Sequence, residues 1–513
     1  MRATDDRPNL LLILADQLRA DALGCMGNPI VQTPSLDRLA GEGTLFTNAM
    51  VTQPTCTPSR ASLLTGCYPS VLRSRMVGCT TPDDARFLPH VLADRGYRTA
   101  SIGKIHLVPQ GTEPDAIARA RQPDGGYDYY GFQEIDLVNG HGDACFGPQY
   151  TPWLLERVPD AARRLSRRQR YARGVQDCYS YELPAEVHSS NYIGARAEAF
   201  LREAADREQP FFLQVSFPDP HHPFAVPEPH ASLHNPGDMP SPVPPVVESG
   251  DPTPLHLDAY YARNLRMAGQ RGSADRVIGT KPEHYDRYTT EDWQQVKALY
   301  YGMVSLLDEN IGRILSALST TGLAESTLVV FTADHGDYLG DHGMYGKGLP
   351  YDGALHVPLI FAGAGVSAEG RVDTVASLLD VAPTILDWSH IAEPEGVQGG
   401  SLASTLAGQA APRRTAALTE NDDDFVPMKM RVLTTNDWKL VTYVGETYGE
   451  LYDRHNDPDE MLNRWSNPDF AQIKAGLREM LFEEVMCSFD VINGRRQSPS
   501  PPKSVKWVPR HNA

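Results

Sequence analysis

The chain has 513 residues, of which 41% are hydrophobic and 22% charged, a composition typical of a globular protein. This length predicts one large α/β unit and a smaller second unit. The formal net charge of −18 argues against a nucleic-acid binder, which needs a basic face, and against binding to an anionic membrane surface. It does not exclude a small anionic substrate, because local cations outweigh the global field inside a cleft. The seven cysteines are scattered and include no CxxC pair, which argues against a disulfide framework and a structural zinc site.

The first apolar run, residues 10–15, predicts a buried parallel strand that ends at Asp16. The run is too short for the hydrophobic region of a signal peptide, and acidic residues precede it. No other stretch is long enough to span a bilayer. The sequence therefore predicts a cytoplasmic protein that does not enter a membrane.

Three further apolar runs, residues 211–217, 328–332 and 357–362, have the composition of buried strands. The first leads to His221 and the second to Asp334. Open parallel sheets build active sites from polar residues at the carboxyl ends of their strands. We therefore expect an α/β protein in which helices separate the strands.

Helical patterns follow some of these runs. A helix is expected to start near residues 61–64, with Pro58 in its first turn. Thr289 is a candidate N-cap for a long helix that continues to about Leu318 with apolar residues at helical spacing. Residues 223–290 are rich in proline and histidine and have little periodicity, which predicts a surface excursion outside the core.

A second domain is expected to begin near residue 415. Residues 430–434, 438–443 and 450–453 predict successive antiparallel strands, and an amphipathic helix is expected around residues 470–486. The proline-rich tail, residues 491–513, does not have the composition to pack alone. We expect it to help form a homo-oligomer, with a loose tail as the alternative.

Residues 53–66, QPTCTPSRASLLTG, place Cys56 four residues before Arg60. A thiol near a helix N-terminus with an arginine one turn further on suits a nucleophile, and a buried structural cysteine is the alternative. The stretch resembles the signature of the sulfatase family, within the alkaline phosphatase superfamily, in which Cys-x-Pro-x-Arg is recognised on the unfolded chain. The resemblance implies that a formylglycine-generating enzyme oxidises Cys56 to formylglycine during maturation. The nucleophile would then be an aldehyde hydrate at position 56.

Two strand ends match the metal ligands of this family. Asp16 and Gln17 follow the first strand, and Asp334 and His335 follow a later one. Taken alone, they could be a helix cap and a turn. By resemblance, they hold one divalent ion together with an oxygen from residue 56, a hard site rich in oxygen ligands. Many sulfatases have Asp and Asn in place of Gln17 and His335, which leaves open whether the ion is calcium, our first choice, or manganese.

Three further motifs resemble the family. Gly-Lys-Ile-His places Lys104 and His106 two residues apart, so on a strand both side chains would point to one face. Pro-His-His-Pro contains His221 at the matching position, and a later Gly-Lys contains Lys347. Taken alone, each could be an ordinary surface or core residue.

The resemblance implies an alkaline-phosphatase-like α/β/α sandwich around a large mixed, mostly parallel sheet, with a smaller C-terminal α+β subdomain. We expect residues 1–414 to form the catalytic domain. Residues 415–490 are expected to form an antiparallel sheet with a packed helix, and residues 491–513 a tail.

The implied reaction is hydrolysis of a small anionic ester, an aryl or alkyl sulfate, to alcohol and sulfate. Asp334 is expected to accept the proton of the attacking hydroxyl. His221, alone or with Lys347, would protonate the leaving alcohol, and His106 would take a proton from the remaining hydroxyl as sulfate leaves. The metal and three cations would neutralise the sulfuryl oxygens: Arg60, Lys104 and Lys347.

Two other functions remain open at this point. A phosphonate monoester hydrolase or phosphodiesterase would use the same nucleophile and metal ligands, but relatives of that kind replace the pair formed by Lys104 and His106 with uncharged residues. An inactive binding protein on this fold would be expected to have lost part of the set, which is intact here. The sequence does not identify the alcohol, whose cleft should come from residues 107–150 and 223–290. Candidate lining residues there are Tyr127, Tyr129, Tyr130, His141, His222 and His230.

Overall fold

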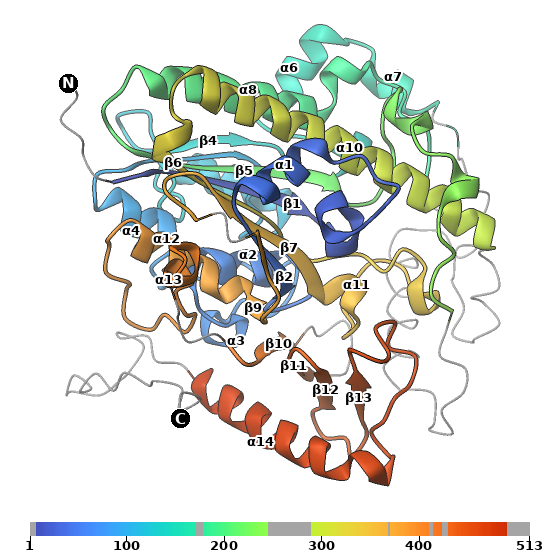
Figure 1. Ribbon diagram of the computed structural model, residues 1–513. Coiled ribbons are helices and arrows are strands. Elements are labelled where there is room, and N and C mark those ends of the chain that lie inside the picture. The colour runs from blue at the N-terminus through green and yellow to red at the C-terminus, as the bar shows by residue number, and fades with distance from the viewer. Residues whose placement is uncertain are drawn as a thin grey trace.

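The computed structural model describes residues 7–167, 169, 178–244, 289–367, 370–409, 414–422 and 429–489. Its largest feature is a nine-stranded sheet at the centre of the molecule (Figure 1). The strands of this sheet are β1 (Asn9–Asp16), β2 (Thr44–Met50), β3 (Arg98–Gly103), β4 (Glu134–Leu137), β5 (Phe211–Pro220), β6 (Thr327–Ala333), β7 (His356–Ala362), β8 (Gly370–Val372) and β9 (Ala376–Ser377).

The strand order is β4-β3-β5-β1-β6-β7-β2-β8, and β9 pairs with β2. Strand β7 runs antiparallel to both of its neighbours, and every other pair is parallel. The expected mixed, mostly parallel sheet is therefore confirmed. The strands predicted from apolar runs are also confirmed, except that residues 357–362 run against the main direction.

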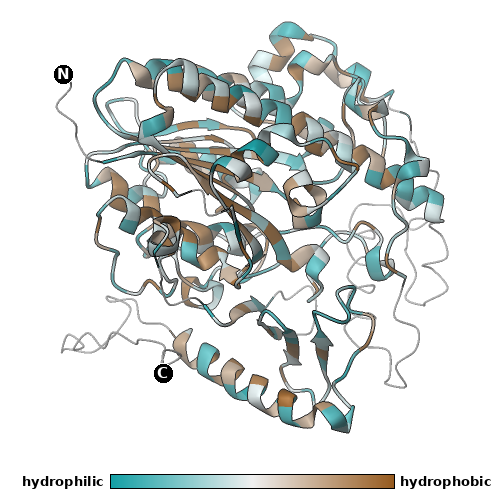
Figure 2. Cartoon of the chain, in the orientation of Figure 1, coloured by the Kyte–Doolittle hydropathy of each residue, from teal (hydrophilic) through white to brown (hydrophobic). Residues whose placement is uncertain are grey.

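Helices cover both faces of the sheet, which gives three layers (Figure 1). Figure 2 shows the strands between these layers as largely hydrophobic along their whole length, as expected for a sheet buried on both sides. One face is covered by α1 (Pro34–Glu42), α8 (Ser189–Ala205) and α10 (Thr290–Thr320), and the other by α2 (Cys56–Thr65), α4 (Leu88–Ala93) and α12 (Val381–Trp388). Shorter helices are α3 (Pro69–Leu72), α5 (Glu113–Arg119), α6 (Tyr150–Arg157), α7 (Ala161–Leu165), α11 (Asp352–Leu355) and α13 (Ala403–Leu406). None of the described helices combines the length and the apolar character needed to cross a membrane.

The long predicted helix is confirmed as α10, and its N-terminus is capped as the sequence predicts. The Asp292 N–H donates to Thr289 Oγ1 at 3.2 Å, and the Thr289 N–H donates to Asp292 Oδ2 at 3.1 Å. This reciprocal pair satisfies two N–H groups that the helix itself leaves unpaired. Beyond the last turn, Gly322 has φ +73°, a conformation that favours glycine.

The surface excursion predicted for residues 223–290 is wrong for its first part. Phe224 and Val226 are fully buried, and the 3₁₀ turn that begins at His230 packs against α10. Gly302 of α10 allows this contact, because a Cβ at that position would lie 2.3 Å from the His230 carbonyl oxygen. The segment has no regular period, yet it inserts single apolar side chains into the core. Residues 245–288 lie outside the described residues.

A separate four-stranded antiparallel sheet follows in the C-terminal part, with α14 (Ala471–Cys487) packed on it (Figure 1). Its three predicted strands and its helix are confirmed, and the first strand was not predicted. The division of the chain at residue 415 stays a prediction, and the tail from 491 to 513 lies outside the described residues. In order, the strands are β10 (Ala417–Asn421), β11 (Met430–Thr434), β12 (Trp438–Tyr443) and β13 (Gly449–Asp453).

Candidate active site

The predicted site residues gather at one edge of the large sheet. Parallel strands place their carboxyl ends at the same edge, so polar residues that follow them meet there. Strand β1 ends at Asp16, and the chain continues from β3 to Lys104, from β5 to His221 and from β6 to Asp334. The side chains of Asp16, Lys104 and Asp334 are fully buried.

Cys56 is the first residue of α2, so the helix begins before residues 61–64, and Pro58 lies in its first turn as the sequence predicts. Its Sγ lies 3.2 Å from His335 Nε2, 2.9 Å from Lys347 Nζ and 3.8 Å from Asp16 Oδ1. Burial and Asp16 raise the pKa of the Cys56 thiol, but Lys104, Lys347 and His335 outweigh them and hold it well below its ordinary value. Position 56 is therefore surrounded by cations that favour an anion at this atom.

Arg60, one turn after Cys56 in α2, connects this helix to the strand ends. Its Nε donates to Asp334 Oδ2 at 2.7 Å, and its Nη1 donates to the Lys104 carbonyl oxygen at 3.0 Å and to Ser216 Oγ at 2.9 Å. Its Nη2 is buried without a hydrogen-bond partner among the described residues and lies 3.6 Å from Asp16 Oδ2. Arg60 therefore fixes the direction in which α2 presents position 56.

The site has the donor atoms of a divalent-cation centre. Ligand atoms of Asp16, Cys56, Asp334 and His335 all lie within 4.8 Å of one another. His335 Nδ1 lies 3.0 Å from the Gly336 carbonyl oxygen, so the N–H at Nδ1 donates there and Nε2 is the nitrogen that acts as an acceptor or a metal ligand. If Cys56 were converted to formylglycine, as the sequence resemblance implies, an oxygen of the hydrate would take the place of its sulfur. The set would then be rich in oxygen and would fit Ca²⁺ or Mn²⁺.

Gln17, the fifth predicted ligand, has its backbone and its side-chain amide held by several neighbours. Its backbone has φ +67°, and its N–H donates to Asp334 Oδ1 at 3.0 Å. Its Nε2 donates to Asp337 and lies 3.1 Å from His222 Nδ1, while Lys347 Nζ donates to its Oε1 at 2.8 Å. Asp337 was not predicted from the sequence as a site residue, although it is the second carboxylate in the run Asp-His-Gly-Asp.

The ammonium group of Lys104 contacts two residues of the site. Its Nζ forms an ion pair with Asp16 and lies 2.8 Å from His141 Nε2. The ring of His141 stacks on that of His221 with centroids 3.6 Å apart. Burial and the charge of Lys104 lower the pKa of His141 to about 3, and burial, followed by His141 and Lys347, holds the pKa of His221 well below its ordinary value. Both rings are therefore neutral at neutral pH.

The expectation that Lys104 and His106 share one face of a strand is wrong. Strand β3 ends at Gly103, and His106 lies beyond it with φ +59°. His106 is nevertheless 3% exposed, and its Nδ1 has no hydrogen-bond partner among the described residues. Burial lowers the pKa of His106 well below its ordinary value, and Lys104 and Arg60 lower it further. A neutral, buried imidazole with a free nitrogen can accept a proton.

Lys347 lies in a loop that the C-terminal sheet supports. Its Nζ lies 2.9 Å from His335 Nε2, as well as 2.9 Å from Cys56 Sγ. Asn421 Nδ2 at the end of β10 donates to the Gly348 carbonyl oxygen at 2.7 Å. Lys439 Nζ of β12 donates to the Pro350 carbonyl oxygen at 3.0 Å. The second sheet therefore helps to position a cation of the site.

Comparison with known proteins identifies the family. The family model described as Sulfatase matches residues 8–391. The chain belongs to the sulfatase family. A second model, N-sulphoglucosamine sulphohydrolase, C-terminal, matches residues 340–486 of this sulfatase. An arylsulfatase of Clostridium perfringens (strain 13 / Type A) is 28% identical over 93% of the chain and 94% of its own length. The multifunctional alkaline phosphatase superfamily protein PehA of Trinickia caryophylli is 30% identical over 91% and 93%.

Solved structures give the same fold. The phosphonate monoester hydrolase of Agrobacterium radiobacter has a TM-score of 0.74 and 27% identity, covering 94% of this sulfatase and 96% of that chain. The phosphonate monoester hydrolase SpPMH of Silicibacter pomeroyi has a TM-score of 0.76 and 25% identity over 94% and 96%. The predicted alkaline-phosphatase-like fold and the sulfatase resemblance are therefore confirmed, and the chain is an enzyme of the sulfuric ester hydrolase class.

Only some of the predicted cleft-lining residues contact the sulfatase site. His141 contacts Lys104, and His222 Nδ1 lies 3.1 Å from Gln17 Nε2. The others have contacts elsewhere: Tyr129 donates to Glu113, Tyr130 donates to the Thr81 carbonyl oxygen, His230 lies 3.0 Å from Glu309, and Tyr127 lines a separate surface cavity with His90.

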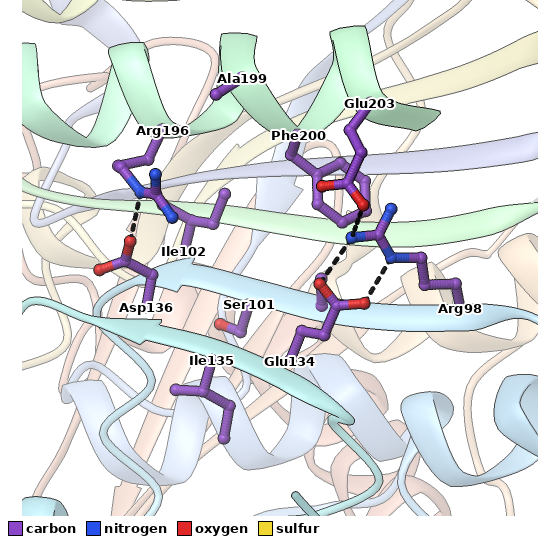
Figure 3. Close-up of a pocket in the computed structure, with 11 residues that line it drawn as sticks. Arg98, Ser101, Ile102, Glu134, Ile135, Asp136, Arg196, Ala199, Phe200 and Glu203 are labelled. Carbon is purple, nitrogen blue, oxygen red and sulfur yellow. Dashed lines mark hydrogen bonds and ion pairs between the residues drawn. The ribbon is translucent and has the colours of Figure 1, made fainter. Parts of the chain in front are cut away.

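A second cavity of about 160 Å³ lies between α8, β3 and β4 (Figure 3). Its charged groups already pair with one another. Arg196 lies 2.6 Å from Asp136, and Arg98 pairs with Glu134 and lies 3.4 Å from Glu203. Arg98 is at the start of β3, whereas Lys104 follows its end. This cavity is therefore distinct from the sulfatase site.

Proposed function

We propose that this sulfatase hydrolyses small aryl or alkyl sulfate esters to alcohol and sulfate. The buried ammonium of Lys104, beside Asp16 and close to position 56, supports the proposal most directly. Together with Lys347 and Arg60, it surrounds position 56 with fixed positive charge in a site from which water is largely excluded. Preorganised charge of this kind stabilises an anionic transition state most strongly where the dielectric is low.

We assign one divalent ion, Ca²⁺ or alternatively Mn²⁺, to Asp16, Gln17, Asp334 and His335. When bound, it lowers the pKa of a coordinated hydroxyl and offsets charge on the sulfuryl oxygens. Formylglycine made from Cys56 supplies the hydroxyl that attacks sulfur, so a formylglycine-generating enzyme is a required partner during maturation.

The proposed proton transfers use residues of the chain itself. Asp334 accepts the proton of the attacking hydroxyl, and Arg60, 2.7 Å from Asp334 Oδ2, holds that carboxylate in place. His106 takes the second proton as sulfate leaves: its lowered pKa keeps the ring unprotonated beforehand, and its Nδ1 has no other partner among the described residues.

His221 is assigned the transfer of a proton to the leaving alcohol. It is neutral before substrate binds, because burial and the neighbouring His141 and Lys347 depress its pKa. An anionic ester beside Lys347 offsets part of this effect and raises the pKa of His221. In the complex, His221 can then carry the proton that the leaving oxygen needs.

Phosphonate monoester hydrolysis is the second candidate. It is favoured by the 27% identity with the phosphonate monoester hydrolase of Agrobacterium radiobacter over 94% of the chain. The ligand pairs Asp16-Gln17 and Asp334-His335 suit either reaction. Lys104→Met tests the choice: we expect kcat/KM to fall at least tenfold more for an aryl sulfate than for an aryl phosphonate with the same phenol. Equal losses would mean that Lys104 does not determine the preference.

We also propose that the protein is a cytoplasmic homo-oligomer with residues 1–414 as its catalytic domain, and that the tail from 491 to 513 contributes to the assembly. Deletion of this tail is expected to lower the number of subunits per particle in light scattering. An unchanged number would contradict the role of the tail.

A further inference from the structure

A buried carboxylate lies behind the site in a position that the proposed reaction does not use. Glu113, the first residue of α5, is fully buried. Its Oε2 accepts the His106 N–H at 3.1 Å and the side-chain N–H of Asn139 at 2.9 Å. Its Oε1 accepts the Leu107 N–H at 3.3 Å and the Tyr129 O–H at 2.9 Å. Four donors therefore converge on one side chain.

This arrangement suits a carboxyl group better than an amide of the same size. A carboxylate offers about four acceptor positions and no donor; three of the groups around Glu113 are N–H donors, and the fourth, the Tyr129 hydroxyl, can donate as well. An amide in its place would direct an N–H₂ group at two of them. Buried donors left without an acceptor destabilise the local structure.

Three of the donors come from two loops that each hold a site histidine. The loop after β3 contains His106, whose φ of +59° is uncommon for a residue other than glycine and needs support from its surroundings. The loop after β4 contains Asn139, two residues before His141, which contacts Lys104 and stacks on His221. Glu113 is the shared partner of both loops.

We propose that Glu113 is a positioning residue of the active site, which joins the His106 loop to the His141 loop through three hydrogen bonds and is itself held by a fourth from Tyr129. The inference rests on the proposed role of His106 in proton transfer. Glu113 touches neither the metal ligands nor position 56 in any contact described above. Its effect on turnover therefore passes through the two histidines.

The matched control is Asp308 of α10, which is 2% exposed. Its carboxylate accepts two successive backbone N–H groups, those of Ser35 at 3.0 Å and Leu36 at 2.8 Å, as Glu113 does with His106 and Leu107. Asp308→Asn and Glu113→Gln therefore impose the same chemical change on two buried carboxylates, one remote from the site and one behind it.

Glu113→Gln is expected to lower kcat/KM by about 10- to 100-fold, the effect of a small misplacement of catalytic groups. Asp308→Asn is expected to stay within about twofold of wild type per folded molecule, because a change away from the active site acts on the stability of the fold and not on the reaction. In a double-variant cycle, Glu113→Gln should add less than about threefold to the loss caused by His106→Ala. The proposal would be overturned if the loss of kcat/KM in the double variant equalled the product of the two single-variant losses. Equal losses in Glu113→Gln and Asp308→Asn would also overturn it.

Hydrogen–deuterium exchange supplies a readout that is independent of substrate. Glu113→Gln should speed exchange at the His106 and Leu107 amides and in the loop around Asn139, whereas Asp308→Asn should not. Unchanged exchange in both loops would overturn the proposal even if the wild type proved inactive on sulfates, an outcome that would refute the proposed function alone. If Glu113→Gln does not fold, Tyr129→Phe removes one donor only, and the same faster exchange is expected at Leu107. Its absence there would also count against the proposal.

Discussion

Lys439 of β12 is the residue whose replacement should most clearly link the C-terminal sheet to the stability of the site. Its side chain is fully buried, and its ammonium forms ion pairs with Asp352 and Glu460. It also donates to the Pro350 carbonyl oxygen at 3.0 Å, in the loop that carries Lys347. Lys439→Met keeps the length of the side chain but leaves two carboxylates facing each other.

The expected loss follows from the burial of these partners. Removing one member of a buried ion pair destabilises a protein by about 3–5 kcal/mol, because the remaining charge stays buried without compensation. The side chain of Glu460 is only 3% exposed, whereas that of Asp352 is 25% exposed and also contacts Arg454 at 3.1 Å. We therefore expect a loss of about 3 kcal/mol at pH 8, near the lower end of that range.

The loss of stability in Lys439→Met should be larger at high pH than at low pH. Burial raises the pKa of Glu460 above its ordinary value, and Lys439 opposes this rise, so the variant should raise it further. Between the two pKa values, the folded protein keeps the proton on Glu460, whereas the unfolded chain has released it. The free energy of unfolding therefore falls as the pH rises above about 4.5 toward the folded pKa of Glu460. Each pH unit in this window lowers the free energy of unfolding by up to about 1.4 kcal/mol. The variant should therefore be closer to wild type at pH 5.5 than at pH 8.

Urea unfolding followed by tryptophan fluorescence at both pH values measures this difference. Arg202→Met is the control, because its side chain is 64% exposed and its ion pair with Glu198 lies on the surface of α8. That variant should lose less than about 1 kcal/mol at either pH. A loss below about 1 kcal/mol for Lys439→Met at pH 8, or a loss that does not change with pH, would refute the reasoning.

Three further predictions concern the reaction. Cys56→Ala should remove nearly all turnover while leaving part of the metal affinity, measured by calorimetry; wild-type kcat in this variant would rule out position 56 as the source of the nucleophile. His221→Ala should slow esters with poor leaving groups by about 10²- to 10⁴-fold and good ones far less, and equal losses across a series of phenols would contradict its role as an acid. Dialysis against a chelator should abolish turnover and lower the unfolding midpoint, with Ca²⁺ or Mn²⁺ restoring both. Full activity in protein shown to be free of metal by emission spectrometry would exclude the assigned ion.

The main elements of the fold could be predicted where one physical signal dominates. Strand β1 is apolar from Leu10 to Ala15 because helices cover both faces of the sheet. Helix α10 shows both its cap at Thr289 and its period in the sequence. Strand β10 and the burial of Phe224 could not be predicted, because both depend on partners distant in the chain. No local pattern of the sequence reports such contacts.

The site could be predicted as a set of motifs but not in its supporting contacts. The residues that follow strand ends, such as Asp16 and Asp334, have a position that the sheet explains. His106 was assigned to a strand because its spacing from Lys104 suggested one, whereas its backbone turns at φ +59°. Glu113 was missed, because a single carboxylate on a short helix has no spacing that distinguishes it from a surface residue. Its role depends on the two loops that fold against it.

The most direct test of the proposed function is a pair of steady-state rates from one preparation in which mass spectrometry shows residue 56 converted to formylglycine. The substrates are an aryl sulfate and an aryl phosphonate monoester with the same leaving phenol. A much larger kcat/KM for the sulfate is the result that the buried Lys104 and the neutral His106 predict. A larger kcat/KM for the phosphonate would contradict the account and would mean that the metal ligands, which suit both reactions, leave the choice to other parts of the cleft.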